Sequence, residues 1–162
     1  MTDTRPDTPA NRPSSFPWPP ALLVASVVAA WVLQRVFPLT WPGMDDLAAR
    51  IVGLGLGVAG ILLMAWSIIT LRRARTTVMP TEAAIVLVTD GPFRYRRNPI
   101  YLADILILLG IAELMRNAWL VLLTPVFGLL VTWLAIIPEE RHLEARFGDE
   151  YRAYKARTRR LI

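Results

Sequence analysis

Two polar clusters in this 162-residue chain combine residue types that bind a charged, flat ligand. The first is the run of residues 91–101, GPFRYRRNPIY, which leads into an apolar stretch. The second is Glu139–Glu140, which follows another apolar stretch. Guanidinium groups and carboxylates bind opposite charges, while aromatic rings bind cations and planar groups. If both clusters lie at one membrane face they form a single site, and we expect chemistry there rather than anchoring alone.

Apolar stretches lie next to both clusters and must position them. The chain is 54% hydrophobic and its mean hydropathy is +0.42, and both values are high for a soluble domain of this size. A bilayer core of about 30 Å requires roughly 20 apolar residues. The predicted spans are residues 21–37, 51–71, 101–115 and 118–137. The third is short and contains Asp104 and Glu113, so it requires protein neighbours or a thinned bilayer. The predicted fold class is all-α integral membrane, with about four transmembrane helices.

The distribution of positive charge predicts the orientation. Six arginines lie between the second and third stretches, and a further seven arginine and lysine residues lie between positions 141 and 160. The opposite side has little beyond Arg50 and Arg116. The positive-inside rule therefore predicts cytoplasmic N- and C-termini, and we expect the inner or plasma membrane of a bacterium. We interpret the net charge of +5 as setting the orientation in the membrane and favouring contact with anionic lipids. Nucleic acid is not an expected partner.

The chain divides into three predicted parts. Residues 1–20 contain six prolines and several charges, which predicts a disordered tail rather than a signal peptide. Residues 21–71 are predicted to be a two-span hairpin, and residues 72–162 a cofactor-binding half with two spans and a C-terminal helix. In that last helix Leu143, Phe147, Tyr151 and Tyr154 have helical spacing, which predicts an amphipathic cytoplasmic segment bent near Gly148.

Two apparent motifs favour simpler interpretations. Residues 55–60, GLGVAG, match the spacing of a dinucleotide-binding fingerprint, but no strand precedes them and no acid follows at the required distance. Small residues such as Gly53 and Gly57 instead predict close helix packing. Glu139 and His142 form only half of a carboxylate–histidine metal site, and the chain has no cysteine. No metal is therefore expected, and His142 is interpreted as a surface residue.

Four fragments together resemble the isoprenylcysteine carboxyl methyltransferase family and its phospholipid methyltransferase relatives. They are residues 87–95, residues 97–101, the Pro-Glu-Glu of residues 138–140, and the FGDEYxxY of residues 147–154. The likeness covers roughly the C-terminal half and includes the order, the spacing and the placement against the last two spans. It implies a membrane methyltransferase that binds S-adenosylmethionine on the cytoplasmic side. The acceptor would be a lipophilic molecule or lipid-linked group that enters from the bilayer.

The resemblance also implies roles for individual residues. The nucleoside would be lined by Leu87, Val88, Thr89, Gly91 and Phe93, with Asn98, Pro99 and Tyr101 at its polar edge. Glu139 or Glu140 would meet the amino or hydroxyl groups of the cofactor, and Arg97 and Glu140 would be catalytic. Asp104 lies one turn beyond Tyr101 and has two interpretations. It either binds an amine substrate or pairs with a nearby arginine.

Two departures from the family pattern bear on the chemistry. Asn98 stands where the family usually has histidine, so histidine-based proton transfer is not expected there. Ala135 and Ile136 are apolar where the prenylcysteine branch has an arginine that receives a carboxylate. Two other functions stay open: a sterol-type membrane reductase that uses NADPH, and a non-catalytic membrane protein on the same scaffold. The sequence leaves the methyl acceptor and the oligomeric state open.

Overall fold

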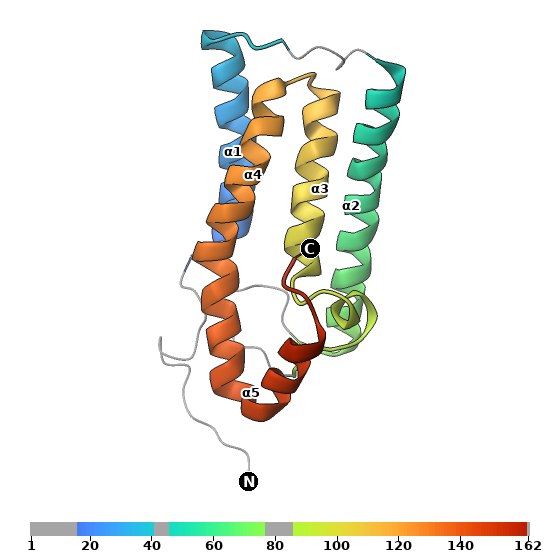
Figure 1. The fold of residues 1–162 in the computed structure, drawn as a ribbon, viewed down its shortest axis with the longest axis vertical. Helices are drawn as coiled ribbons and strands as arrows, with labels where there is room; N and C mark the ends of the chain where they lie inside the picture. The colour runs from blue at the N-terminus through green and yellow to red at the C-terminus, as the bar shows by residue number, and fades with distance from the viewer. Residues whose placement is uncertain (1–15, 41–45, 77–85, 162) are drawn as a thin grey trace.

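The computed structural model describes residues 16–40, 46–76 and 86–161, and these residues form helices without strands. The first four α-helices stand side by side in Figure 1, and the last one continues downward from the fourth. The elements are α1 (Trp18–Val36), α2 (Leu47–Arg73), the 3-10 turn η2 (Gly91–Arg94), α3 (Pro99–Leu114), α4 (Ala118–Val131), the π-helical turn η3 (Thr132–Ile136) and α5 (Ile137–Arg157).

The prediction of an all-helical membrane protein is supported by the lengths of these helices. Three helices in the described residues are long and apolar enough to cross a membrane, namely α1, α2 and the continuous helix Ala118–Arg157. The apolar part of that last helix ends at Ile137, and charged residues follow. Helix α3 has 16 residues, so it is shorter than the other three.

The first two helices begin earlier than predicted. Helix α1 starts at Trp18, three residues inside the predicted tail, because Pro19 and Pro20 occupy its first turn, where proline needs no N–H partner. Helix α2 starts at Leu47 rather than at residue 51. Residues 1–15 of the predicted tail lie outside the described residues.

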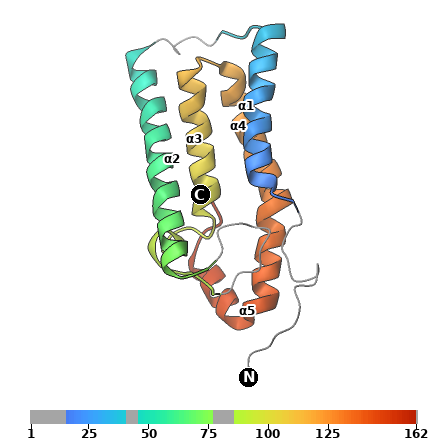
Figure 2. The ribbon, with the colours of Figure 1, turned by 180° about the vertical axis from the view of Figure 1, so that it is seen from behind.

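Each of the first two helices packs chiefly on a helix of the C-terminal half. Helix α1 packs on α4, α2 packs on α3, and α3 packs on α4. Figures 1 and 2 show the resulting order α1, α4, α3, α2 across the bundle. The two consecutive helices α1 and α2 therefore lie on opposite sides of the bundle, and both contact α3.

Glycines allow α2 to approach α3 closely. A Cβ atom on Gly57 would lie 2.9 Å from the Cα atom of Gly110, and one on Gly60 would lie 2.9 Å from the carbonyl oxygen of Ala103. A Cβ atom on Gly53 would lie 2.8 Å from the Cβ atom of Glu113. The small-residue interpretation of this stretch is therefore confirmed, and its partner is another helix of the same chain.

Asn117 joins α1 to α4 at the end of the bundle opposite α5. Its side-chain oxygen accepts a hydrogen bond from the Leu120 N–H at 3.2 Å and so caps α4. Its amide nitrogen donates to the carbonyl oxygen of Ala30 at 3.0 Å. Trp119 adds a bond from its indole N–H to the carbonyl oxygen of Phe37 at 2.8 Å.

Gly148 bends α5, as the sequence predicts. Its φ of 53° lies in the left-handed region, which glycine adopts without a steric penalty, and the chain turns back there in Figure 1. Beyond the bend, Tyr151 and Tyr154 are buried, at 1% and 3% exposure. The predicted apolar face is therefore divided at Gly148, and its second part packs inward against the protein.

Candidate functional site

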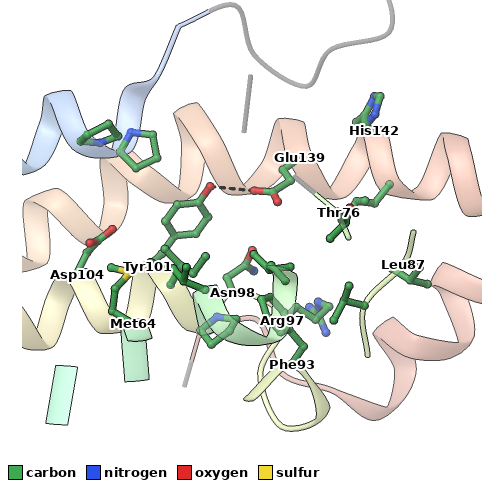
Figure 3. A pocket seen from close by; sticks show the side chains of 18 of the residues that line it. Met64, Thr76, Leu87, Phe93, Arg97, Asn98, Tyr101, Asp104, Glu139 and His142 are labelled. Atoms are coloured by element: carbon green, nitrogen blue, oxygen red, sulfur yellow. Dashed lines mark hydrogen bonds between the residues drawn. The ribbon is translucent and has the colours of Figure 1, made fainter. Parts of the chain in front are cut away.

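A cavity of about 500 Å³ lies where α2 ends and α5 begins. Its walls come from five parts of the chain: the first turns of α1, the last turns of α2, residues 86–99, the start of α3, and α5. The two polar clusters of the sequence face each other here across the bundle (Figure 3). The expectation that they form one site agrees with this geometry.

Nine of the twelve site residues predicted from the sequence line this cavity: Leu87, Val88, Phe93, Arg97, Asn98, Pro99, Tyr101, Asp104 and Glu139. Thr89, Gly91 and Glu140 do not. Gly91 has a φ of 56°, and a Cβ atom there would lie 2.7 Å from the Thr70 hydroxyl. Its role in the structure is thus to turn the chain and to let η2 pack on α2.

Tyr101 and Glu139 connect the two sides of the cavity. The Tyr101 hydroxyl donates to Oε2 of Glu139 at 2.9 Å, and Figure 3 shows the two side chains pointing toward each other from α3 and α5. Tyr101 is 7% exposed. The pair places a carboxylate and an aromatic face beside each other, an arrangement that suits a cationic ligand with hydroxyl groups.

Glu140 faces away from the cavity toward two arginines. Nε of Arg97 donates to its Oε1 at 3.1 Å, and Arg160 donates through Nε at 3.1 Å and through Nη2 at 2.7 Å. Burial would raise the pKa of Glu140, but these hydrogen bonds and the two positive charges outweigh burial and lower it below its ordinary value. Of the two consecutive acids, Glu139 faces the cavity and Glu140 supports its wall.

Arg97 lines the cavity and also holds the end of α5. Its Nη1 donates to the carbonyl oxygen of Lys155 at 3.0 Å and to that of Thr158. The side chain is only 10% exposed. A guanidinium at a helix C-terminus satisfies carbonyl groups that have no partner within the helix.

Asp104 lies at the far end of the cavity from Leu87 (Figure 3). It is 7% exposed, and Met64 of α2 lies near it in the cavity wall (Figure 3). Within residues 16–40, 46–76 and 86–161, the carboxylate makes no hydrogen bond or ion pair. Of its two interpretations, pairing with a nearby arginine is therefore not observed in the described part of the chain.

Several cavity residues were not identified from the sequence. His142, which the sequence predicts at the surface, lines the cavity, and its Nε2 is buried without a hydrogen-bond partner in the described residues. His142 follows Glu139 by three residues, so both lie on one face of α5, and this spacing is visible in the sequence. Tyr154 also lines the cavity, and its hydroxyl donates to the carbonyl oxygen of Phe93 at 2.7 Å. No cluster of three or more metal-binding side chains occurs in the described residues.

Comparisons with known proteins agree with these motifs. The phospholipid methyltransferase family model matches residues 48–150, which include α2, α3, α4 and most of α5. An uncharacterised protein of Haemophilus influenzae is 43% identical over 65 residues, which are 39% of this chain and all of that protein. No solved structure matches the chain. The family match covers more than half of the chain and contains both polar clusters, so this protein belongs to the phospholipid methyltransferase family of membrane methyltransferases.

Proposed function

We propose that the protein transfers a methyl group from S-adenosylmethionine to a lipophilic acceptor at the cytoplasmic membrane face. One observation carries this proposal: the cavity has a polar part, which contains Arg97, Asn98 and Glu139, and an apolar part lined by α1 and α2. Its volume of about 500 Å³ lies within the range of small-molecule sites. An enzyme of this kind must hold a polar cofactor and an apolar acceptor side by side.

The residues of the polar part fit S-adenosylmethionine. Leu87, Val88 and Phe93 form an apolar wall suited to a flat base, and the Glu139 carboxylate suits an ammonium or a ribose hydroxyl. The orphaned Nε2 of His142 is a further polar atom whose partner a ligand could supply. When bound, the cofactor would supply an electrophilic methyl group. The protein would hold the reactants together and exclude water.

The apolar part of the cavity is where we place the acceptor. Leu23 and Val24 come from α1 and Ile68 from α2, two helices that pack chiefly on other partners. A lipid chain entering there would meet apolar side chains from both helices. Asp104 is the charged group of this part, and an unpaired carboxylate at membrane depth is costly unless a ligand or proton neutralises it. We assign it the binding of a protonatable acceptor and the uptake of its proton.

The proposal also covers the number of membrane spans and their orientation. Helix α3 would be the fourth span, since its neighbours α2 and α4 can shield a helix that is shorter than the bilayer core. Residues 72–162 would carry the cofactor site, and residues 21–71 would supply two spans and part of the acceptor wall. The arginine-rich end, with both termini, would face the cytoplasm of a bacterium, where the residues from Pro138 onward leave the membrane.

Calorimetric titration of the detergent-purified protein tests the cofactor assignment. We expect micromolar binding of S-adenosylmethionine and no binding of NADPH. Glu139→Gln should weaken the binding at least tenfold, because a charge-assisted hydrogen bond is worth about 1.5–3 kcal/mol. Glu150→Gln, an exposed acid on the same helix, is the matched control and should bind as the unmodified protein does. Binding of NADPH alone, or of neither ligand, would refute the proposal.

A further inference from the structure

Residues 158–161, which follow α5, run back beside the loop that enters α3. We call them the C-terminal strap (Figure 1). Arg96 and Arg159 form a parallel bridge, and the Arg97 N–H donates to the carbonyl oxygen of Arg159 at 2.9 Å. The side-chain amide of Asn98 donates to the carbonyl oxygen of Arg160 at 3.2 Å. The strap therefore contacts the part of the loop that supplies Arg97, Asn98 and Pro99 to the cavity wall.

The Arg160 side chain connects the strap to α5. Its guanidinium binds both oxygens of Glu140, and the Glu140 side chain is 6% exposed, whereas that of Arg160 is 42% exposed. Arg97 shares Oε1 of the same carboxylate. One acid on α5 is thus held by one arginine from the loop and by one from the strap. A two-pronged bond of this kind fixes orientation as well as distance.

The direction of the Glu140 side chain fixes the direction of the Glu139 side chain. Successive residues on an α-helix point about 100° apart, so a carboxylate fixed toward the arginines leaves Glu139 directed at Tyr101 in the cavity. Arg160 does not line the cavity, although it contacts a residue adjacent to one that does. Any effect of Arg160 on the cavity must pass through Glu140 and the strap.

We propose that Arg160 is a positioning residue. Through its bonds to Glu140 it orders the loop of residues 96–99 and fixes the direction of the Glu139 side chain. This inference rests on the proposed cofactor site. Without the fork of Arg160, Glu140 keeps a single arginine partner, Arg97. The strap keeps its hydrogen bonds to Arg97 and Asn98 but loses its bond to α5 through Glu140. Cofactor binding would then have to order the loop of residues 96–99 and the Glu139 side chain, which are already ordered in the intact protein.

Two readouts test this role. In the ligand-free protein, hydrogen–deuterium exchange of the amides of residues 96–102 should become at least tenfold faster in Arg160→Ala, with the amides of α2 and α4 unchanged. The dissociation constant for S-adenosylmethionine should rise about tenfold, because charge-assisted bonds to Glu140 are lost. Arg160→Lys keeps the charge without the fork and should lie between the two. Arg159→Ala, at an exposed neighbour, is the matched control.

The outcomes separate this inference from the proposed function. Unchanged exchange and unchanged affinity in Arg160→Ala would overturn the positioning role. Faster exchange throughout α2 and α4 would show a general loss of stability and would overturn it as well. If the unmodified protein binds no S-adenosylmethionine, the proposed function fails, while the exchange of residues 96–102 still decides whether Arg160 orders the loop.

Discussion

Tyr101 and Glu139 are 38 residues apart, and their side chains meet in a 2.9 Å hydrogen bond that joins α3 to α5 across the cavity. The bond links the two polar clusters of the sequence directly. It also holds Glu139 in the wall of the cavity that we assign to the cofactor.

Tyr101→Phe keeps the ring and removes the hydroxyl that holds Glu139. We expect the dissociation constant for S-adenosylmethionine to rise three- to tenfold, since a hydrogen bond contributes about 0.5–1.5 kcal/mol net. Calorimetry measures the change. Tyr95→Phe removes a hydroxyl from a side chain in the same motif that is 62% exposed, and its affinity should not change. Equal affinities for both variants would contradict the placement of the site.

Asp104→Asn separates acceptor binding from cofactor binding. Removal of an unpaired buried charge should raise the thermal midpoint, while transfer of a labelled methyl group to a membrane-lipid extract should fall at least tenfold. The affinity for S-adenosylmethionine should stay within twofold. Asp149→Asn, at an acid whose side chain is 97% exposed, serves as the comparison. A variant with full transfer activity would exclude the proposed role of Asp104.

Gly57→Ala tests the close approach of α2 and α3. The new Cβ atom would lie 2.9 Å from backbone at Gly110, so one helix must shift, at a cost of about 1–3 kcal/mol. A lower thermal midpoint in detergent is expected. At Gly55 a Cβ atom would meet no other helix within 4 Å, so Gly55→Ala should leave the midpoint unchanged or raise it slightly, because alanine favours a helix. Similar losses in both variants would argue against this packing.

The pKa of Glu140 predicts an acid-sensitive stability. Arg160 and Arg97 lower the pKa in the folded protein below the ordinary value of 4.5, despite burial. The stabilisation is therefore complete above pH 4.5 and is lost as the pH falls through the lower folded pKa. Glu140→Gln should be less stable at pH 7 and should lose less stability on acidification.

Thermal midpoints between pH 7 and pH 3 measure this difference. Glu150→Gln should retain the acid dependence of the unmodified protein, because that exposed acid takes no part in the arginine cluster. If Glu140→Gln showed the same loss of stability below pH 4.5 as the unmodified protein, Glu140 would not be its source.

Features that depend on local composition were predictable from the sequence. The apolar stretches indicated membrane helices because crossing a bilayer requires a run of apolar residues, whatever their neighbours. Gly148 marked the bend in α5 since glycine adopts a left-handed conformation without strain. The two polar motifs indicated the methyltransferase family because their order and spacing belong to the chain itself.

Features that depend on which surfaces meet were decided by the tertiary structure alone. Glu139 and Glu140 are the same residue type at consecutive positions, and only the packing of α5 directs one to Tyr101 and the other to Arg97 and Arg160. Helix α1 likewise packs on α4 rather than on its sequence neighbour α2. Sequence determines the periodicity and the hydropathy of a helix, whereas its rotation and partners follow from contacts between residues far apart in the chain.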